Sequence, residues 1–346
     1  MSQRDITIDI AKGIGIFLVV LGHVPIPMWL ATPIYMFHMP LFFFLSGMFF
    51  HLNEDRKMGL YKKIRTLIIP YFFFAFCGNT SNVLRDFLFY RTVNIKSVFA
   101  LFNGAASPLW FLICLFGCYL LSRISSLFTW VSETKRMLVG SLFWGGIGIL
   151  LCYNQIDLPM WGAQVLLMQF YYVLGYLSRN VQCLNTTFYK TIVHAKRLFI
   201  AMALIGFIVC CLPFAIRPNV STLDFYHPVP FFIGSLLGIF LCIRFSNLLS
   251  HINCGIKDLI CKMGNKSLFI LGFHFYVLFH LYFIAIPLLA RIANLWNIEF
   301  TGEYLRNCYW VGIFLVLPSI WISMILGKIC MGRLKLPVGG INLVHT

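Results

Sequence analysis

Ten apolar segments of 16 to 24 residues recur along this chain, and short stretches that hold most of its charged residues separate them. The hydrocarbon core of a bilayer is about 30 Å thick, so an α-helix needs about 20 apolar residues to cross it. Only 11% of the 346 residues are charged, whereas a soluble domain carries about 25%. We therefore expect an all-α fold, a polytopic membrane bundle of about ten transmembrane helices.

No stretch outside these segments is long enough for a second globular domain, so residues 1–346 are predicted to form a single integral-membrane domain. The predicted spans are residues 6–26, 33–50, 65–82, 107–122, 137–153, 160–178, 198–216, 230–245, 266–289 and 307–327. The first segment lacks a basic region followed by a small-x-small cleavage site. We therefore expect it to be a retained helix and not a cleaved signal peptide.

The basic residues indicate how the spans are oriented. One side of the membrane, which we call the basic side, collects 21 of the 27 lysines and arginines and includes both chain ends. The opposite side holds the other six, namely Arg85, Arg91, Lys96, Arg217, Arg291 and Arg306. Cytoplasmic loops are enriched in lysine and arginine, so both termini are predicted to be cytoplasmic. This bias also accounts for the net charge of +16, and no nucleic-acid partner is expected.

The 12 cysteines show no CxxC pair and no paired spacing, and most of them lie inside apolar runs. A free thiol in such a place behaves as a small hydrophobic group. The sequence therefore predicts neither a disulfide framework nor a metal site.

The first predicted span, DIAKGIGIFLVVLGHV, carries two ionisable residues, Lys12 and His23. At 100° per residue, His23 returns to within about 20° of the face of Lys12, roughly 16 Å along the axis. Ile16 and Val19 complete that face. Ionisable groups inside a membrane are costly and usually face the bundle interior or a water-filled cavity. The alternatives are that Lys12 snorkels to the interface and that His23 only bonds a neighbouring helix.

Two prolines, Pro25 and Pro27, are predicted to end this helix just past His23. The histidine should therefore lie near a helix terminus, where water and unpaired carbonyl groups reach it.

A basic cluster, RKMGLYKKIRTLIIPY, precedes the third predicted span and contains Lys62, Lys63 and Arg65. Charge alone would satisfy the orientation rule for cytoplasmic loops. The alternative is a phosphate site, because Lys62 and Arg65 lie about one helical turn apart and can bind phosphates together.

Five segments together resemble the integral-membrane acyltransferases known as acyltransferase family three, and within it the branch named for fucose 4-O-acetylase. The segments are DIAKGIGIFLVVLGHV, FHMPLFFFLSGMFF, YKKIRTLIIPYFFF, SPLWFLICL and GNKSLFILGFHF. They occur in the family's order and extend from Asp9 to about His274.

Two signatures of that family are present. A basic residue, ten intervening residues and a histidine are filled by Lys12 and His23, and a pair of arginines three apart is filled by Lys62 and Arg65. Most members have arginine at the first position. Lysine keeps the charge but lacks the planar fork for bidentate pairing.

The resemblance implies a ten-helix enzyme of the bacterial inner membrane that transfers an acyl group, most often acetyl, from cytoplasmic acyl-CoA to a carbohydrate hydroxyl. The acceptor would be a surface polysaccharide or a lipid-linked sugar, surrounded by membrane lipids, and no permanently bound cofactor is implied. The alternative is a polytopic transporter, flippase or polymerase of glycolipid precursors. Only the enzyme would consume acyl-CoA and release a free thiol.

The same resemblance assigns roles to particular residues. His23 and Lys12 are expected to be the catalytic residues. His23 would be the general base or the nucleophile, because the pKa of histidine suits proton transfer near neutral pH, and Lys12 lies on the same face of the helix. Lys62, Lys63 and Arg65 are expected to bind the donor. Acceptor or oxyanion contacts are expected from His38, Ser46, Trp110, Asn265 and His274. For Trp110, the alternative is a place in the aromatic belt at the membrane interface.

Overall fold

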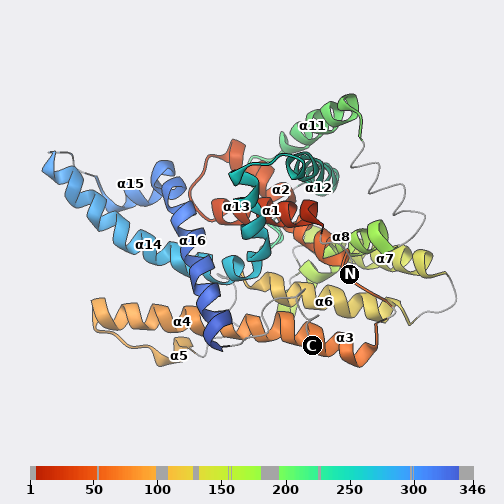
Figure 1. Ribbon diagram of the computed structural model, residues 1–346, viewed down its shortest axis with the longest axis horizontal. Coiled ribbons are helices and arrows are strands. Elements are labelled where there is room, and N and C mark those ends of the chain that lie inside the picture. The colour runs from red at the N-terminus through yellow and green to blue at the C-terminus, as the bar shows by residue number, and fades with distance from the viewer. Residues whose placement is uncertain are drawn as a thin grey trace.

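The computed structural model describes residues 5–52, 54–98, 108–127, 132–154, 156, 158–180, 195–224, 227–296, 298 and 300–334. Over these ranges the chain is built from helices, and the β-pairing present is an isolated bridge between Asn219 and Asp224 in a connecting loop. The predicted all-α bundle is therefore confirmed. Figure 1 shows its helices gathered around α1 (Ile6–Gly22).

The other elements follow in chain order, and each predicted span overlaps a helix. They are α2 (Met28–Gly47), α3 (Arg56–Lys63), the π-helix η1 (Ile64–Ile68), α4 (Ile69–Tyr90), α5 (Ile95–Val98), α6 (Trp110–Ser125), α7 (Glu133–Tyr153), the 3₁₀-helix η3 (Pro159–Trp161), α8 (Gly162–Asn180), α11 (Arg197–Cys211), α12 (Pro228–Ser250), α13 (Gly255–Asn265), α14 (Ser267–Leu295), α15 (Gly302–Asn307) and α16 (Tyr309–Leu334).

Within the described ranges, six helical stretches are long and apolar enough to cross a membrane, and α6 and α11 are shorter apolar helices. The six are Met28–Gly47, Arg56–Tyr90, Glu133–Tyr153, Pro228–Ser250, Ser267–Leu295 and Tyr309–Cys330. Helices satisfy every backbone hydrogen bond internally, which the hydrocarbon core requires. The chain is thus a multi-pass membrane protein.

The boundaries of the first two spans differ from those predicted. α1 ends at Gly22, four residues early, because Pro25 and Pro27 cannot continue it. α2 begins at Met28, five residues early, and carries both Pro33 and a second proline inside it. Proline is tolerated in membrane helices because neighbouring groups compensate for the missing backbone bond.

Two further differences involve segments between spans. One helical run, Arg56–Tyr90, replaces the shorter span predicted at 65–82 and passes through a π-turn at η1. Residues 246–265, which lie between the spans predicted at 230–245 and 266–289, contain the end of α12 and all of α13. A helix of 11 residues is too short to cross a bilayer, so a search for spans overlooks it.

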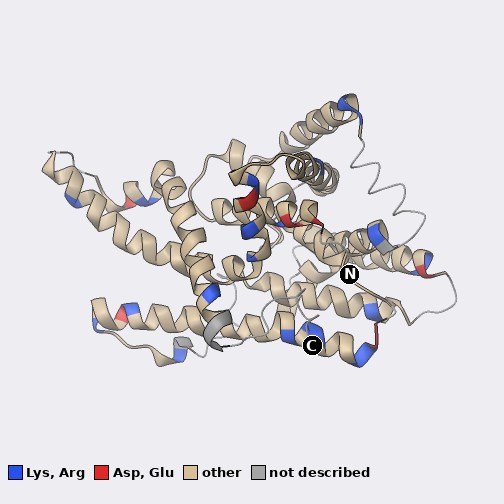
Figure 2. Ribbon diagram, viewed as in Figure 1, with Lys and Arg blue, Asp and Glu red and all other residues tan. Residues whose placement is uncertain are grey.

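Charged residues mark the ends of the helices. Figure 2 shows lysines and arginines at helix termini and in the connections, whereas the middles of α6, α14 and α16 carry none. This distribution keeps most of the charge away from the apolar centre of the bundle, and Lys12, which lies well inside α1, departs from it.

Glycine lets the helices at the centre approach closely. A Cβ atom at Gly47 of α2 would overlap the carbonyl oxygen of Tyr172, and one at Gly175 of α8 would overlap that of Phe44. α1 and α13 meet in the same way, because a Cβ atom at Gly264 would overlap the carbonyl oxygen of Asp9. Close backbone contact of this kind maximises dispersion attraction, which drives helix association where lipid replaces water.

We predict that Gly47→Ala destabilises the protein by about 1–3 kcal/mol, because the added methyl group meets backbone that cannot rotate away. Thermal unfolding in detergent micelles measures the effect. Gly146→Ala on α7 is the matched control, since its methyl group would meet no atom within 4 Å. Equal melting temperatures for both variants would contradict the packing described above.

Candidate active site

One face of α1 runs along two neighbouring cavities. Lys12 and Ile16 line the larger cavity, and Val19 and His23 line the smaller one. The stripe predicted from helical periodicity therefore faces the interior along its whole length. The ammonium group of Lys12 lies 4.7 Å from the centroid of the Phe49 ring, so it points into the protein.

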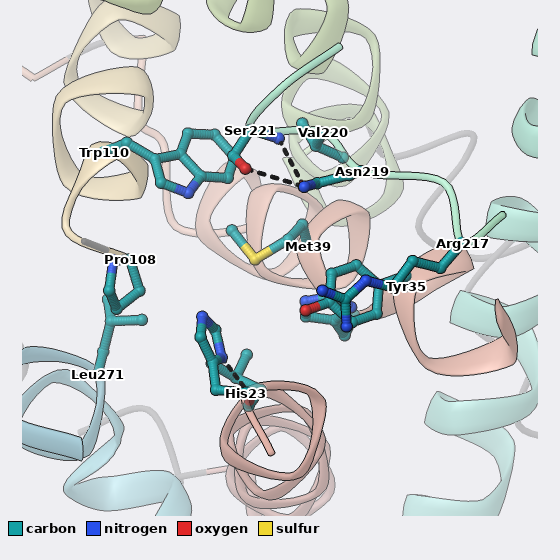
Figure 3. Close-up of a pocket in the computed structure, with 12 residues that line it drawn as sticks. His23, Tyr35, Met39, Pro108, Trp110, Arg217, Asn219, Val220, Ser221 and Leu271 are labelled. Atoms are coloured by element: carbon teal, nitrogen blue, oxygen red, sulfur yellow. Dashed lines mark hydrogen bonds between the residues drawn. The ribbon is translucent and has the colours of Figure 1, made fainter. Parts of the chain in front are cut away.

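The smaller cavity, of about 180 Å³, surrounds the imidazole of His23. Figure 3 shows this ring projecting from the end of α1 into the space between Leu271 and Met39. Trp110, at the start of α6, forms another wall and is buried, so it does not lie in a lipid-facing belt. His23, at the end of one helix, and Trp110, at the start of another, thus line the same cavity.

A cation lies on the wall of the smaller cavity. The Cζ atom of Arg217 is 4.5 Å from the centroid of the Tyr35 ring. Tyr35 is fixed in turn, because its hydroxyl donates to the carbonyl oxygen of Gly22 over 2.8 Å and its ring meets His38 edge-on at 5.0 Å. The guanidinium of Arg217 is therefore held close to His38, in the cavity that His23 also lines.

The loop that carries Arg217 is tied down by its own polar groups. The side-chain oxygen of Asn219 accepts hydrogen bonds from the backbone N–H of Ser221, at 3.1 Å, and from its hydroxyl, at 2.8 Å. Gln164 of α8 donates to the carbonyl oxygen of Ser221 over 3.0 Å. Because Asn219 and Ser221 line the cavity, this ordered loop forms part of its wall.

Three histidines share one hydrogen-bond pattern, which decides their tautomer. The Nδ1 atoms of His23, His38 and His274 lie 2.7, 2.6 and 2.8 Å from the carbonyl oxygens four residues earlier. A carbonyl oxygen only accepts, so in the neutral ring Nδ1 carries the proton and Nε2 keeps a lone pair. Each imidazole thereby presents a basic nitrogen, and in His23 that ring projects into the cavity.

His274 lies behind His23 and does not line either cavity. Their ring centroids are 5.0 Å apart and the planes nearly perpendicular. His274 is fully buried, and its backbone carbonyl accepts a hydrogen bond from Ser319 over 3.3 Å. Its position fits a role in holding His23 and not one in touching an acceptor.

The larger cavity, of about 430 Å³, is apolar in its depth and basic at its mouth. Lys12, Lys62 and Lys63 line it, together with Ser46 and Thr66. The volume lies within the range of about 300–1,000 Å³ that is usual for small-molecule sites.

The mouth also carries some negative charge. Glu54 pairs with Lys62 over 3.4 Å, and both line the cavity. Partial burial lowers the pKa of His51, which lies on the same rim, so this ring is neutral at pH 7. The basic residues at the mouth thus exceed the acidic ones.

Besides His274, two predicted site residues lie outside both cavities. Arg65, in η1, and Asn265, at the exposed end of α13, line neither cavity. Ser46 lies in the larger cavity, away from the wall that holds His23. Over the described residues, no group of three or more histidine, cysteine or acidic side chains is placed to hold a metal ion.

Sequence reasoning missed Arg217, Tyr35 and the Asn219–Ser221 turn. One signal was present, because Arg217 is among the few basic residues assigned to the side where the first span ends. Two chain segments that end on the same side of a membrane have a chance to meet, whatever their separation in sequence. Tyr35 gave no such signal, since tyrosine is common in apolar spans.

A match to a known protein family identifies the class of protein that carries this site. Residues 5–329 match the family described as "Acyltransferase domain". The chain is a member of this acyltransferase family. The match covers nearly the whole chain, and it confirms the resemblance read from the five motifs. The transporter alternative has no such support.

A further comparison gives a more distant relative. A protein from Sinorhizobium fredii named "Nodulation protein NolL" is 30% identical to this acyltransferase over 148 residues. The aligned region spans 38% of this chain and 39% of that protein, so the likeness extends over less than half of either. No solved structure matches the chain.

We predict that His38→Ala lowers the rate of acyl transfer about ten-fold or more, because it removes a buried hydrogen-bonding group from the cavity around His23. Thiol release from acyl-CoA by membranes with equal amounts of each protein measures the rate. His280→Ala is the matched control, since His280 lines neither cavity and its Nε2 lies 3.1 Å from Ser81. A similar rate for both variants would remove His38 from the site.

Proposed function

We propose that this acyltransferase moves an acetyl group from acyl-CoA to a hydroxyl of a carbohydrate, either a surface polysaccharide or a lipid-linked sugar. The observation that carries the proposal is the single face of α1 on which Lys12 lines a basic cavity and His23 lines a polar one. A donor with phosphates at one end and a reactive thioester at the other matches that pair of environments.

The donor enters the larger cavity. CoA carries several negative charges, and Lys12, Lys62 and Lys63 attract them. The thin pantetheine arm then lies along the apolar depth of the cavity, toward His23. Apolar walls such as those formed by Phe42 and Leu115 exclude water and limit hydrolysis of the thioester.

The acceptor hydroxyl enters the smaller cavity. A sugar hydroxyl is a weak nucleophile at neutral pH, so it needs a base. The lone pair on Nε2 of His23 takes the hydroxyl proton as the oxygen attacks the thioester carbon. The tetrahedral intermediate then expels the CoA thiolate, which takes that proton from the imidazolium. The products are the acetyl ester and free CoA thiol.

Negative charge develops on the thioester oxygen during this step, and donors aimed at it lower the barrier. The indole N–H of Trp110 and the guanidinium of Arg217 line the same cavity and supply them. His38, also on the wall, contacts the acceptor.

The same lone pair permits a second route, in which Nε2 attacks the thioester carbon, the C–S bond breaks and CoA leaves as the thiolate. The acceptor hydroxyl then attacks the acetyl-imidazole, the acetyl group passes to its oxygen, and the hydroxyl proton goes to the thiolate. Rapid denaturation of the enzyme after mixing with radiolabelled acetyl-CoA distinguishes the two routes. Label on the protein indicates the covalent route, and label on the acceptor alone indicates direct transfer.

We propose the cellular setting from the charge distribution and the family resemblance together. Chain segments that line the larger cavity end on the basic side, which is the predicted cytoplasmic side where acyl-CoA is made. We accordingly place the protein in a bacterial inner membrane, with both termini in the cytoplasm and the smaller cavity toward the opposite face.

We predict that His23→Ala lowers acetyl transfer by about 10²-fold or more, because it removes the base. The assay gives radiolabelled acetyl-CoA and the host glycolipid fraction to membranes and follows label in the glycan and free thiol together. His251→Ala, at an exposed position after α12, is the control. Equal transfer by both variants would show that His23 is only a packing residue.

We also predict that Lys63→Gln raises the KM for acetyl-CoA about ten-fold with little change in kcat, because it removes a charge-assisted contact to a phosphate. Lys57→Gln on the same helix is the control, since Lys57 is exposed and lines neither cavity. If kcat falls and KM stays constant, Lys63 does not bind the donor.

A further inference from the structure

Two side chains separate the two cavities. Met39 of α2 and Leu271 of α14 are the residues, among those the structure describes, that line both of them. Both side chains are buried, and they come from different helices. Figure 3 shows them on either side of the space above His23. They form a constriction between the donor cavity and the histidine.

Ordered neighbours fix the position of this constriction. One turn before Leu271, Ser267 and Leu268 line the larger cavity, and three residues after it His274 contacts the ring of His23. On α2, Met39 directly follows His38, whose imidazole is bonded to its own helix. The constriction therefore lies at the level where the thioester has to stop if its carbonyl carbon is to meet Nε2.

We infer that Met39 and Leu271 select the acyl group by size and polarity, admitting acetyl and excluding longer or charged acyl groups. The inference rests on the proposed function. If the CoA phosphates stay among Lys12, Lys62 and Lys63 while the thioester reaches His23, the acyl group has to pass between these two side chains.

The narrowness and the apolar character of the constriction both favour a short, neutral acyl group. A thioether and an isobutyl group offer no hydrogen bond, so the carboxylate of a succinyl group would lose its water without replacement while it passes between these two side chains. A butyryl group is neutral, and it is excluded by size alone. One methylene in a fitted apolar site is worth about 1–3 kcal/mol, or roughly 10–200-fold in rate.

The test compares acetyl-CoA, butyryl-CoA and succinyl-CoA as donors for the full chain in lipid nanodiscs with the host glycolipid fraction. Leu271→Ala is expected to raise the ratio of kcat/KM for butyryl to that for acetyl at least ten-fold, and Met39→Ala is expected to raise it in the same direction. Succinyl transfer stays low in both, because the wider gap is still apolar.

Met36→Ala is the matched control. Met36 lies on the same helix one turn away and is fully buried, but it lines neither cavity. It is expected to keep the donor ratio of the wild type. A ratio that also rises in this variant would show that general loosening of α2 explains the effect, and would overturn the inference.

The remaining outcomes separate the inference from the proposed function. If the wild type transfers acetyl and the ratio is unchanged in Leu271→Ala and Met39→Ala, the selection by these residues is refuted and the acetyl-transfer proposal stands. If Leu271→Ala does not fold, Leu271→Phe gives the opposite test, since a narrower gap should reduce kcat/KM for acetyl as well. If the wild type releases no thiol from any of the three donors, both proposals fail.

Discussion

The structure depends on the cost of placing ionisable side chains inside an apolar bundle. Lys12 and His23 are tolerated because one face of α1 is turned toward cavities and away from lipid. Five helices pack against α1 and separate it from lipid, namely α2, α12, α13, α14 and α16. Every polar group near His23 then needs a partner, and the three imidazoles obtain one from the carbonyl oxygen of the preceding helical turn. The same bond that stabilises each ring leaves its other nitrogen basic, so a requirement of folding also prepares the chemistry.

Close packing positions the face of α1 that carries Lys12 and His23. Glycines at the contacts of α2 with α8 and of α1 with α13 bring backbones together, which fixes the rotation and the depth of α1 relative to its neighbours. A helix held in this way presents Lys12 to one cavity and His23 to the other without adjustment. Enzymes that act by positioning and by preformed dipoles need such rigidity, because small displacements of a base or an oxyanion donor reduce the rate sharply. The ordered loop at Asn219 and Ser221 adds the last fixed wall.

Much of the fold was predictable from the sequence, and the reasons are physical. Apolar runs of about 20 residues mark membrane helices because backbone groups have to be satisfied within each segment. Each predicted span therefore overlaps a helix of the described residues, and six of the helical stretches are long and apolar enough to cross a membrane. Their ends were less certain, since a proline can end a helix, as at Pro25, or lie inside one, as at Pro33. The search for spans did not predict the short helix α13. Such a search detects long apolar segments, and this amphipathic helix of 11 residues is neither long nor strongly apolar.

The sequence by itself determined the membrane class, the shared face of Lys12 and His23, and the family to which the chain belongs. These follow from composition, from the 100° step of a helix and from ordered motifs, all of which are local along the chain. Only the tertiary structure decided that Arg217 and Tyr35 meet beside His23, that Arg65 and Asn265 line neither cavity, and that two cavities exist with a constriction between them. Such contacts depend on how helices far apart in sequence are rotated and stacked, and side-chain packing between them, unlike helical periodicity, leaves no local pattern in the chain.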